Sequence, residues 1–274
     1  MAVCEVCFRH CNIGEGEFGA CGARSSRDGM VYAANYGRIT SLALDPIEKK
    51  PLARFYPGSK ILSVGSYGCN LFCPFCQNHE ISRSKGEDVD TVITPEQLAD
   101  IALRYTDKGN IGIAFTYNEP LIGYEFIRDT AVLTKAEGLK NVLVTNGTAE
   151  LAVLDKVLPY IDAMNIDIKS FSDKTYSEVL RGDLDSVKDF IVRSASGCHV
   201  ELTTLIVPGM NDSEDEIREL SSWIANIDDR IPYHISRFFP RYNMCDRSAT
   251  DVSLIYRLAD VAREQLKYVY TGNC

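Results

Sequence analysis

Residues 68–78 read GCNLFCPFCQN and hold three cysteines, Cys69, Cys73 and Cys76, in the spacing C-x3-C-x2-C. Thiols two to four residues apart are typical of metal sites, because a short loop can wrap them around one centre. Structural zinc sites and iron–sulfur clusters usually take four protein ligands, so this loop offers one too few. Either a residue elsewhere in the chain or a small molecule must therefore complete the coordination.

Composition limits the classes of function that the chain can have. Its 274 residues are 45% hydrophobic, enough to bury the core of one large domain or of one domain with a small appendage. The net charge of −9 argues against nonspecific binding to nucleic acid, which needs a basic face. No apolar stretch reaches the length of a membrane span, and no charged-then-apolar leader precedes Cys4. We expect a soluble, cytoplasmic protein without membrane contact.

From about residue 60, short β-branched or apolar runs alternate with helix-length segments of period near 3.6. Thr94 before Pro95 is a typical helix start, and Gly109 and Gly138 suit helix ends. Such alternation predicts a parallel sheet covered by helices. Six strand–helix units are too few for a complete eight-fold barrel, so we predict an α/β fold, a partial (β/α)6 TIM-like barrel, over 59–274. The expected strands are 60–67, 111–117, 141–146, 163–169, 199–207, 233–238 and 266–273, and the clearest helices are 94–109, 120–138 and 212–227.

Residues 1–58 do not show this alternation of strand and helix patterns. The stretch MVYAANYGRITSLAL (30–44) predicts a β-hairpin that turns at Tyr36–Gly37. Four thiols suffice for a closed metal site, and a structural zinc and a second iron–sulfur cluster are both open alternatives for them. We therefore predict a small cysteine-rich N-terminal module with a hairpin. Its cysteines are Cys4, Cys7, Cys11 and Cys21.

Polar motifs recur at the ends of successive predicted strands. In parallel α/β folds the active site collects at the carboxyl ends of the strands, so we expect these motifs to line one cavity. Each motif taken alone is better read as an ordinary turn or a surface ion pair. Their order and placement after the cysteine loop favour a shared site. They are YNEP (117–120), TNG (145–147), DIK (167–169), VPGMND (207–212) and His234, which opens the sixth strand.

A small-molecule ligand explains why three cysteines suffice. Three thiolates on a [4Fe–4S] cluster leave one iron open, and that iron can bind the amine and carboxylate of S-adenosylmethionine (SAM). An electron from the cluster would then cleave the sulfonium and release a 5′-deoxyadenosyl radical. The competing interpretation is a zinc loop that borrows His79 as its fourth ligand.

The string GCNLFCPFCQNHEIS (68–82), with the motifs that follow it, resembles the radical SAM superfamily and, within it, the pyruvate formate-lyase activating enzymes. The N-terminal C-x2-C-x3-C-x9-C, PLARFYPGS (51–59) and YVYTGN (268–273) resemble one subgroup, the AmmeMemoRadiSam system radical SAM enzymes. The resemblance implies an oxidoreductase-type enzyme that cleaves SAM with a [4Fe–4S] cluster. It also implies a one-electron donor such as flavodoxin or ferredoxin, and an unidentified substrate, of which a protein is one version.

Roles carry over by position from this resemblance. Cys69, Cys73 and Cys76 would bind the cluster. Val144 departs from the pattern, because activating enzymes often have an acidic residue before TNG, and this weakens the transfer of their cation site and partner specificity. The residues implied for the SAM pocket are Tyr117, Asn118 and Glu119 at the amino group, Thr145, Asn146 and Gly147 along the wall, Asp167 and Lys169 near the carboxylate, Val207 beside the adenine, and His234 in the ribose and substrate region.

Three functions compete at this point. A glycyl radical enzyme activase would need a barrel mouth that admits a peptide loop of a partner protein. A modifier of a different macromolecule or small molecule would share the SAM chemistry, and the subgroup resemblance and Val144 favour it. The alternative from another class is a noncatalytic metal-binding scaffold, which predicts no SAM cleavage even with a loaded, reduced cluster.

Overall fold

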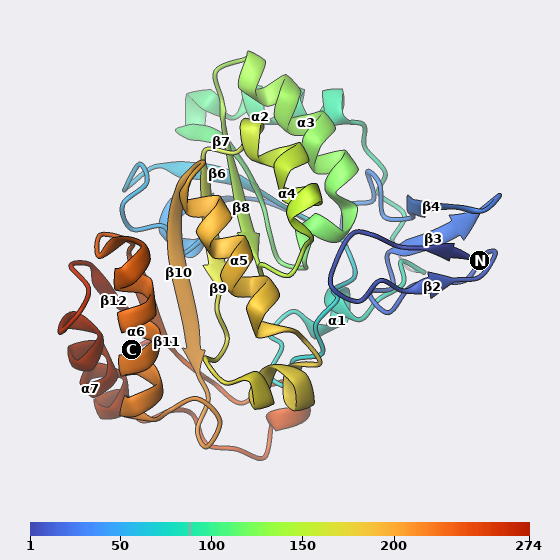
Figure 1. Ribbon diagram of the computed structural model, residues 1–274. Coiled ribbons are helices and arrows are strands. Elements are labelled where there is room, and N and C mark those ends of the chain that lie inside the picture. The colour runs from blue at the N-terminus through green and yellow to red at the C-terminus, as the bar shows by residue number, and fades with distance from the viewer. Residues whose placement is uncertain (88) are drawn as a thin grey trace.

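The computed structural model describes residues 1–87 and 89–274. A curved sheet of eight strands forms its centre, with helices along the outside (Figure 1). The order is β12-β11-β10-β9-β8-β7-β6-β5; β6 through β12 are parallel, and β5 pairs antiparallel with β6. The bounds are β5 Ser41–Pro46, β6 Lys60–Gly65, β7 Asn110–Phe115, β8 Lys140–Thr145, β9 Ala163–Asp167, β10 His199–Ile206, β11 Tyr233–Arg237 and β12 Val269–Gly272.

The crossovers between the parallel strands carry the helices, and the predicted partial barrel is confirmed. No helix in the described part of the chain, 1–87 and 89–274, has both the length and the apolar composition for crossing a membrane. The α-helices are α1 His79–Ser82, α2 Pro95–Arg104, α3 Tyr124–Ala136, α4 Leu151–Val157, α5 Leu184–Ala195, α6 Glu214–Asp228 and α7 Val252–Arg263. Short turns are η1 Ile47–Lys49, η2 Thr106–Lys108, η3 Pro120–Gly123, η4 Leu158–Tyr160, η6 Tyr242–Met244 and the π-helical η5 Thr175–Leu180.

Local sequence signals set the helix boundaries. Thr94 caps α2: its hydroxyl accepts from the backbone N–H of Gln97 at 3.3 Å, and the Gln97 side chain accepts from the Thr94 N–H at 2.8 Å. Such a capping box satisfies two N–H groups that the first turn leaves without partners. Gly109 and Gly138 adopt positive φ of 87° and 76° after η2 and α3, where only glycine is free of steric cost.

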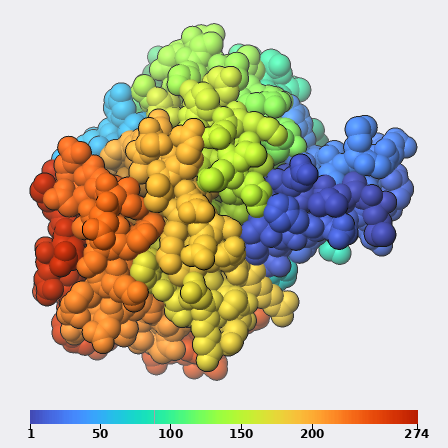
Figure 2. Space-filling model, viewed as in Figure 1, coloured from blue at the N-terminus to red at the C-terminus, as the bar shows by residue number. Residues whose placement is uncertain are grey.

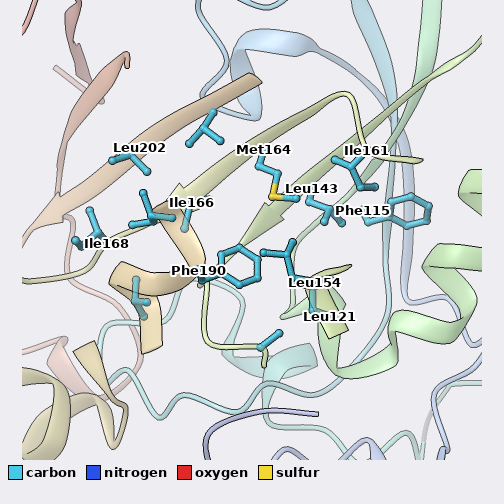
Figure 3. Packing of buried hydrophobic residues seen from close by; sticks show 14 of the residues in the cluster. Phe115, Leu121, Leu143, Leu154, Ile161, Met164, Ile166, Ile168, Phe190 and Leu202 are labelled. Carbon is cyan, nitrogen blue, oxygen red and sulfur yellow. The ribbon is translucent and has the colours of Figure 1, made fainter. Parts of the chain in front are cut away.

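The main hydrophobic core lies between the sheet and the helices (Figure 3). Figure 3 shows Leu143, Met164 and Ile166 of neighbouring strands directed toward Leu154 and Phe190 of the covering helices. The parallel strands are therefore apolar on the helix-facing side, and this packing holds their carboxyl ends in one row.

A second, smaller cluster fills the floor of the barrel. Small side chains on the inner face of the sheet, Ala114, Val142 and Ala163, leave room for Ile47 and Leu52 from the segment after β5. All five are completely buried. The segment between β5 and β6 thus closes the barrel at the end opposite the strands' carboxyl edge.

A buried carboxylate ties this segment to the sheet. Glu201 on β10 accepts hydrogen bonds from the backbone N–H groups of Ala53 at 2.9 Å and Arg54 at 2.7 Å. Its oxygens also lie 2.9 Å from Nε2 of His199 and 2.6 Å from Nε2 of His234. We call these five residues the floor network.

The N-terminal residues form two small antiparallel pairs, β1 (Ala2–Val3) with β2 (Asn12–Ile13) and β3 (Arg24–Arg27) with β4 (Met30–Ala33). A hairpin forms among these residues, but it consists of β3 and β4 and turns at Asp28–Gly29, so the hairpin predicted over 30–44 with a turn at Tyr36–Gly37 is wrong. Asp-Gly accepts the positive φ of a tight hairpin, here 52° and 73°. β5, which was expected to return against β4, pairs with β6 instead. The division at residue 58 stays a prediction, and one strand from before it belongs to the main sheet.

Candidate functional site

A cavity of about 280 Å³ opens at the carboxyl edge of the sheet. Loops after β6, β7, β8 and β9 form most of its wall, and the inner faces of β10 and β11 together with Asn273 after β12 form the rest. Motifs that are far apart in the sequence therefore meet here. The predicted site residues that line this cavity are Cys69, Cys73, Cys76, Tyr117, Asn118, Glu119, Thr145, Asn146, Asp167 and Lys169.

Backbone contacts from other segments hold the cysteine loop. The N–H of Cys69 donates to the carbonyl of Cys21 at 3.1 Å, and the N–H of Phe72 donates to the carbonyl of Leu180 at 2.9 Å. Gly68 has φ of 87°, and a Cβ there would lie 2.6 Å from the Cys21 oxygen. The close approach of the N-terminal residues to this loop therefore requires glycine at position 68.

The three thiols of this loop face the same cavity. Burial raises the pKa of Cys69 to about 12 and that of Cys73 to about 11, so both thiols hold their protons at neutral pH until a cation displaces them. The sulfur of Cys76 lies 3.3 Å from the Ser82 hydroxyl. Three thiols on one cavity fit a cluster that has one iron open to a further ligand.

The zinc alternative receives no support from His79. Its ring stacks on Tyr242 with centroids 4.6 Å apart, and it is not among the residues that line the cavity. Within 1–87 and 89–274, no three or more His, Cys, Asp and Glu side chains are arranged to hold a single metal ion. The fit to a cluster therefore rests on the shared cavity and on the donor type.

Glu119 is a buried carboxylate in the wall of the cavity, with 3% of its surface exposed. It accepts hydrogen bonds from the Thr145 hydroxyl at 2.7 Å and from the backbone N–H groups of Asn146 at 2.7 Å and Leu121 at 3.1 Å. Burial raises the pKa of Glu119 to about 7, although these donors act in the opposite direction. A cation entering the cavity would favour the ionised carboxylate.

The neighbouring residues of the YNEP turn have supporting contacts. The Asn118 side chain accepts from the N–H of Ser66 at 3.1 Å and donates to the carbonyls of Tyr67 and Gly68, both at 3.1 Å. It thereby fixes the turn against the strand end that leads into the cysteine loop. Tyr117 has φ of 73°, an uncommon conformation for an aromatic residue, and its ring points into the barrel.

Asp167 and Lys169 follow β9 and form an ion pair of 3.0 Å at the cavity wall. Residue 168 between them, an isoleucine, is fully buried in the main core, so alternation along the chain directs the two charged side chains to the same side. The backbone N–H of Lys169 donates to the Tyr176 hydroxyl at 3.0 Å. The pair thus places one ammonium and one carboxylate opposite the cysteine loop.

Three predicted residues do not line the cavity. Gly147 lies against the helix-facing core, where a Cβ would meet Ile166 at 2.9 Å. Val207 is fully buried, and its N–H donates to Asn211 at 2.7 Å. His234 belongs to the floor network, because it lies near the beginning of β11 rather than its end.

Sequence reasoning missed two groups of residues. Thr203, Leu205 and Ser236 line the cavity from β10 and β11, and period-two alternation along these predicted strands could have found them. Asp45 and Lys50 form a buried ion pair of 3.0 Å, and the Tyr117 hydroxyl donates to Asp45 at 2.9 Å. No local pattern in the sequence identifies that second group.

The N-terminal cysteines lie outside the cavity. Cys4, Cys7 and Cys21 are buried and Cys11 is half-buried. Burial raises the pKa of Cys7 to about 11, and the charges of Cys4 and Cys21 add to that increase. Three of the four thiols are therefore shielded from solvent, and the charge effects on Cys7 indicate that Cys4 and Cys21 lie near it.

A partial parallel barrel with a three-cysteine loop and converging polar motifs defines a cluster-dependent, SAM-binding class of enzyme. The Radical SAM superfamily model matches residues 63–221, and the chain belongs to the radical SAM superfamily. The predicted superfamily is thereby confirmed, and pyruvate formate-lyase activating enzymes are among the relatives of this chain. The protein is a radical SAM enzyme whose cofactors are a [4Fe–4S] cluster and SAM.

Relatives are similar over much of the chain. An uncharacterized protein of Methanocaldococcus jannaschii, MJ0808, is 41% identical over 274 residues, covering 98% of this chain and 80% of the relative. The pyruvate formate-lyase-activating enzyme of Clostridium pasteurianum is 29% identical over 61% of this chain and 72% of its own length. The AmmeMemoRadiSam subgroup stays a prediction.

Two solved structures support the fold. Streptococcus suis SuiB bound to S-adenosylmethionine matches with a TM-score of 0.61 at 14% identity, over 76% of this chain and 48% of SuiB, so the chain spans about half of that protein. A domain of the pyruvate-formate lyase-activating enzyme of Bacteroides vulgatus matches with a TM-score of 0.51 at 18% identity, over 58% of this chain and 98% of that domain.

Proposed function

We propose that this protein binds its [4Fe–4S] cluster through Cys69, Cys73 and Cys76 and abstracts hydrogen from a substrate held at the mouth of the barrel. The observation that carries this proposal is that the three thiols and Glu119 line one cavity. The bound cluster and SAM would supply a 5′-deoxyadenosyl radical there.

The residues of the cavity have distinct tasks in this proposal. Glu119 would accept a hydrogen bond from the ammonium of SAM, since its own hydrogen-bond donors are all neutral. Lys169 would bind the SAM carboxylate, and Asp167 would orient the Lys169 side chain through their ion pair. The Asn146 amide lies 3.7 Å from the Cys69 sulfur, so it can donate to that ligand. The roles assigned by resemblance to Gly147, Val207 and His234 are indirect in this proposal, because Gly147 and Val207 lie behind the cavity wall and His234 lies in the floor network.

We infer a substrate other than a glycyl radical enzyme. Val144 lines the cavity, so the wall is apolar at the position where activating enzymes often have an acid. The glycyl radical activase is the second candidate function, and the pyruvate formate-lyase-activating relatives support it. A protein substrate and a reductant such as flavodoxin or ferredoxin fit both versions. We also place the enzyme in the cytoplasm, where thiols stay reduced.

Both candidate functions require SAM cleavage. Anaerobic reconstitution with iron and sulfide, followed by reduction in the presence of SAM, tests this step. We expect 5′-deoxyadenosine, detected by mass spectrometry. A fully loaded and reduced protein that releases none would favour the noncatalytic scaffold. Deuterated cell extract separated into protein and small-molecule fractions then tests the substrate class, because the active fraction transfers deuterium to 5′-deoxyadenosine.

The N-terminal cysteines form a second metal site in this proposal, with zinc and an iron–sulfur cluster as the two alternatives. Metal analysis of the Cys69→Ala, Cys73→Ala, Cys76→Ala triple variant separates them, since that variant retains only the N-terminal set. One zinc per chain indicates a structural zinc. Several irons with acid-labile sulfide indicate a cluster. A variant that binds neither metal would contradict the proposal.

A further inference from the structure

Three arginines converge on one aromatic ring in the cysteine loop. The guanidinium carbons of Arg83, Arg9 and Arg181 lie 4.5, 5.1 and 5.3 Å from the centroid of the Phe72 ring. The ring can hold these cations because its face carries negative partial charge. The three arginines come from the N-terminal residues, the end of α1 and the end of η5, so the group forms only in the folded chain.

Carbonyl oxygens hold two of these guanidiniums, those of Arg9 and Arg83. Nε of Arg9 donates to Asn70 O at 2.8 Å, and Nη2 of Arg83 donates to Cys69 O at 3.0 Å. Arg9 also donates to the carbonyl of Arg181. Across residues 1–87 and 89–274, none of the three arginines takes part in an ion pair. Three positive charges that form no ion pair within the described residues thus gather in a chain whose net charge is −9.

The position of this group is as informative as its charge. Phe72 directly precedes Cys73, and yet it does not line the cavity, whereas Leu71 and Cys73 on either side do. The ring therefore points to the outside of the loop. Arg181 is exposed, and Arg9, Arg83 and Phe72 are half-buried. Figure 2 shows the dark blue N-terminal residues seated against the yellow residues of the body, consistent with the contact of Arg9 with residue 181.

We propose that Arg9, Arg83, Arg181 and Phe72 form the docking surface for an acidic one-electron carrier protein. The inference rests on the proposed function, which requires an electron at the cluster while the mouth of the barrel serves SAM and substrate. One electron passes from the reduced carrier to the oxidised cluster, and no bond forms or breaks. Arginine and aromatic side chains are enriched at protein interfaces, and complementary charge speeds association.

Arg181→Glu gives the sharpest test, because this side chain is exposed and packs over the ring of Phe72. The probe is oxidised flavodoxin, titrated into the reconstituted full chain at low and high salt. We expect the dissociation constant of the wild-type complex to rise with salt, and Arg181→Glu to weaken binding by about tenfold at low salt. Cluster reduction by reduced flavodoxin, followed by absorbance, should slow by a similar factor.

Two controls keep this result specific. Arg257→Glu makes the same charge change on an exposed residue of α7 and should leave flavodoxin binding unchanged. Photoreduced deazaflavin, a small uncharged reductant, should reduce the Arg181→Glu cluster at the wild-type rate. If the wild-type protein reduced by deazaflavin cleaves no SAM, the proposed function fails rather than the docking surface.

Equal flavodoxin affinity and equal salt dependence for wild type and Arg181→Glu would overturn the docking proposal. The same holds if flavodoxin binding is unchanged while Arg181→Glu weakens binding of a fluorescent oligonucleotide, because the arginines would then serve a nucleic acid.

Discussion

Two buried glutamates at opposite ends of the barrel have pKa values that are shifted in opposite directions. Glu119 at the mouth is 3% exposed, and burial raises its pKa to about 7. Glu201 at the floor is fully buried, yet its hydrogen bonds from His199, His234 and two backbone N–H groups outweigh burial and lower its pKa to about 2. The difference lies in the partners, because Glu119 has only neutral donors whereas Glu201 adds two imidazoles.

In the proposed function, this difference separates a SAM-binding carboxylate, Glu119, from a structural one, Glu201. In the floor network, both oxygens of Glu201 have hydrogen-bond partners within the protein, so this carboxylate holds the segment after β5 and needs no ligand. Glu119 accepts hydrogen bonds only from neutral donors, and it lines a cavity that three thiols and the ammonium of Lys169 also line. A carboxylate with such a shifted pKa in a cavity is the expected partner of a cationic ligand.

The largest effect on SAM cleavage should come from substitutions at the mouth of the barrel. Changing Cys69, Cys73 and Cys76 together to Ala should abolish both SAM cleavage and the SAM-responsive electron paramagnetic resonance signal, because no thiolate remains to hold the cluster. The floor is untouched, so circular dichroism should show a folded protein. Survival of the SAM-responsive signal would place the cluster elsewhere.

Glu201→Gln should lower the free energy of unfolding at pH 7 by about 3 kcal/mol, since its hydrogen bonds in the folded state lower the pKa of Glu201 to about 2 and so favour the ionised form. A carboxylate with a lowered pKa stabilises the fold above its unfolded pKa of about 4.3, and that contribution is lost as the pH falls toward 2. Denaturant unfolding between pH 7 and pH 3 measures it. The variant should show a flatter pH profile than wild type; matching profiles would refute the role of the floor network.

Glu119→Gln should weaken SAM binding by about ten- to a hundredfold while the cluster still assembles, because a charge-assisted hydrogen bond typically contributes about 1.5–3 kcal/mol. An anaerobic titration that follows the cluster spectrum reports both quantities. Thr145→Val is the matched control: it removes one hydrogen bond of Glu119 but keeps the charge. Equal SAM affinities in the two variants would make Glu119 a structural residue like Glu201.

The smallest effect on catalysis should come from the N-terminal thiols. Cys4→Ala with Cys7→Ala should lower the free energy of unfolding by about 1–3 kcal/mol, through lost burial and lost metal ligands, while 5′-deoxyadenosine production persists. Thermal unfolding and product analysis on the same sample measure both. A folded double variant that releases no 5′-deoxyadenosine would instead make this set part of the catalytic machinery.

Much of the fold was predictable because its signals are local. Each predicted strand from residue 60 onward contains or overlaps an observed one, and Thr94 caps α2 as its sequence indicates. Pairing between distant segments was not predictable. β5 reads as a hairpin partner of β4, but its neighbour is β6, because the choice depends on packing at the barrel edge rather than on alternation.

The same division holds for the site. Residues that directly follow a strand, such as Glu119 and Lys169, reach the cavity as predicted from their position. His234 does not, because it begins its strand and so lies one strand length below the mouth. Arg9 and Arg181 meet at Phe72 only through tertiary contacts, which no spacing rule in a single sequence contains.

The closed floor has a kinetic consequence. Because Ile47, Leu52 and the Glu201 network fill the barrel from below, we expect SAM to enter and its cleavage products to leave by the same opening. A slowly released product therefore blocks the next turnover. We expect 5′-deoxyadenosine and methionine to inhibit competitively against SAM, and an enzyme that removes 5′-deoxyadenosine to raise the steady-state rate.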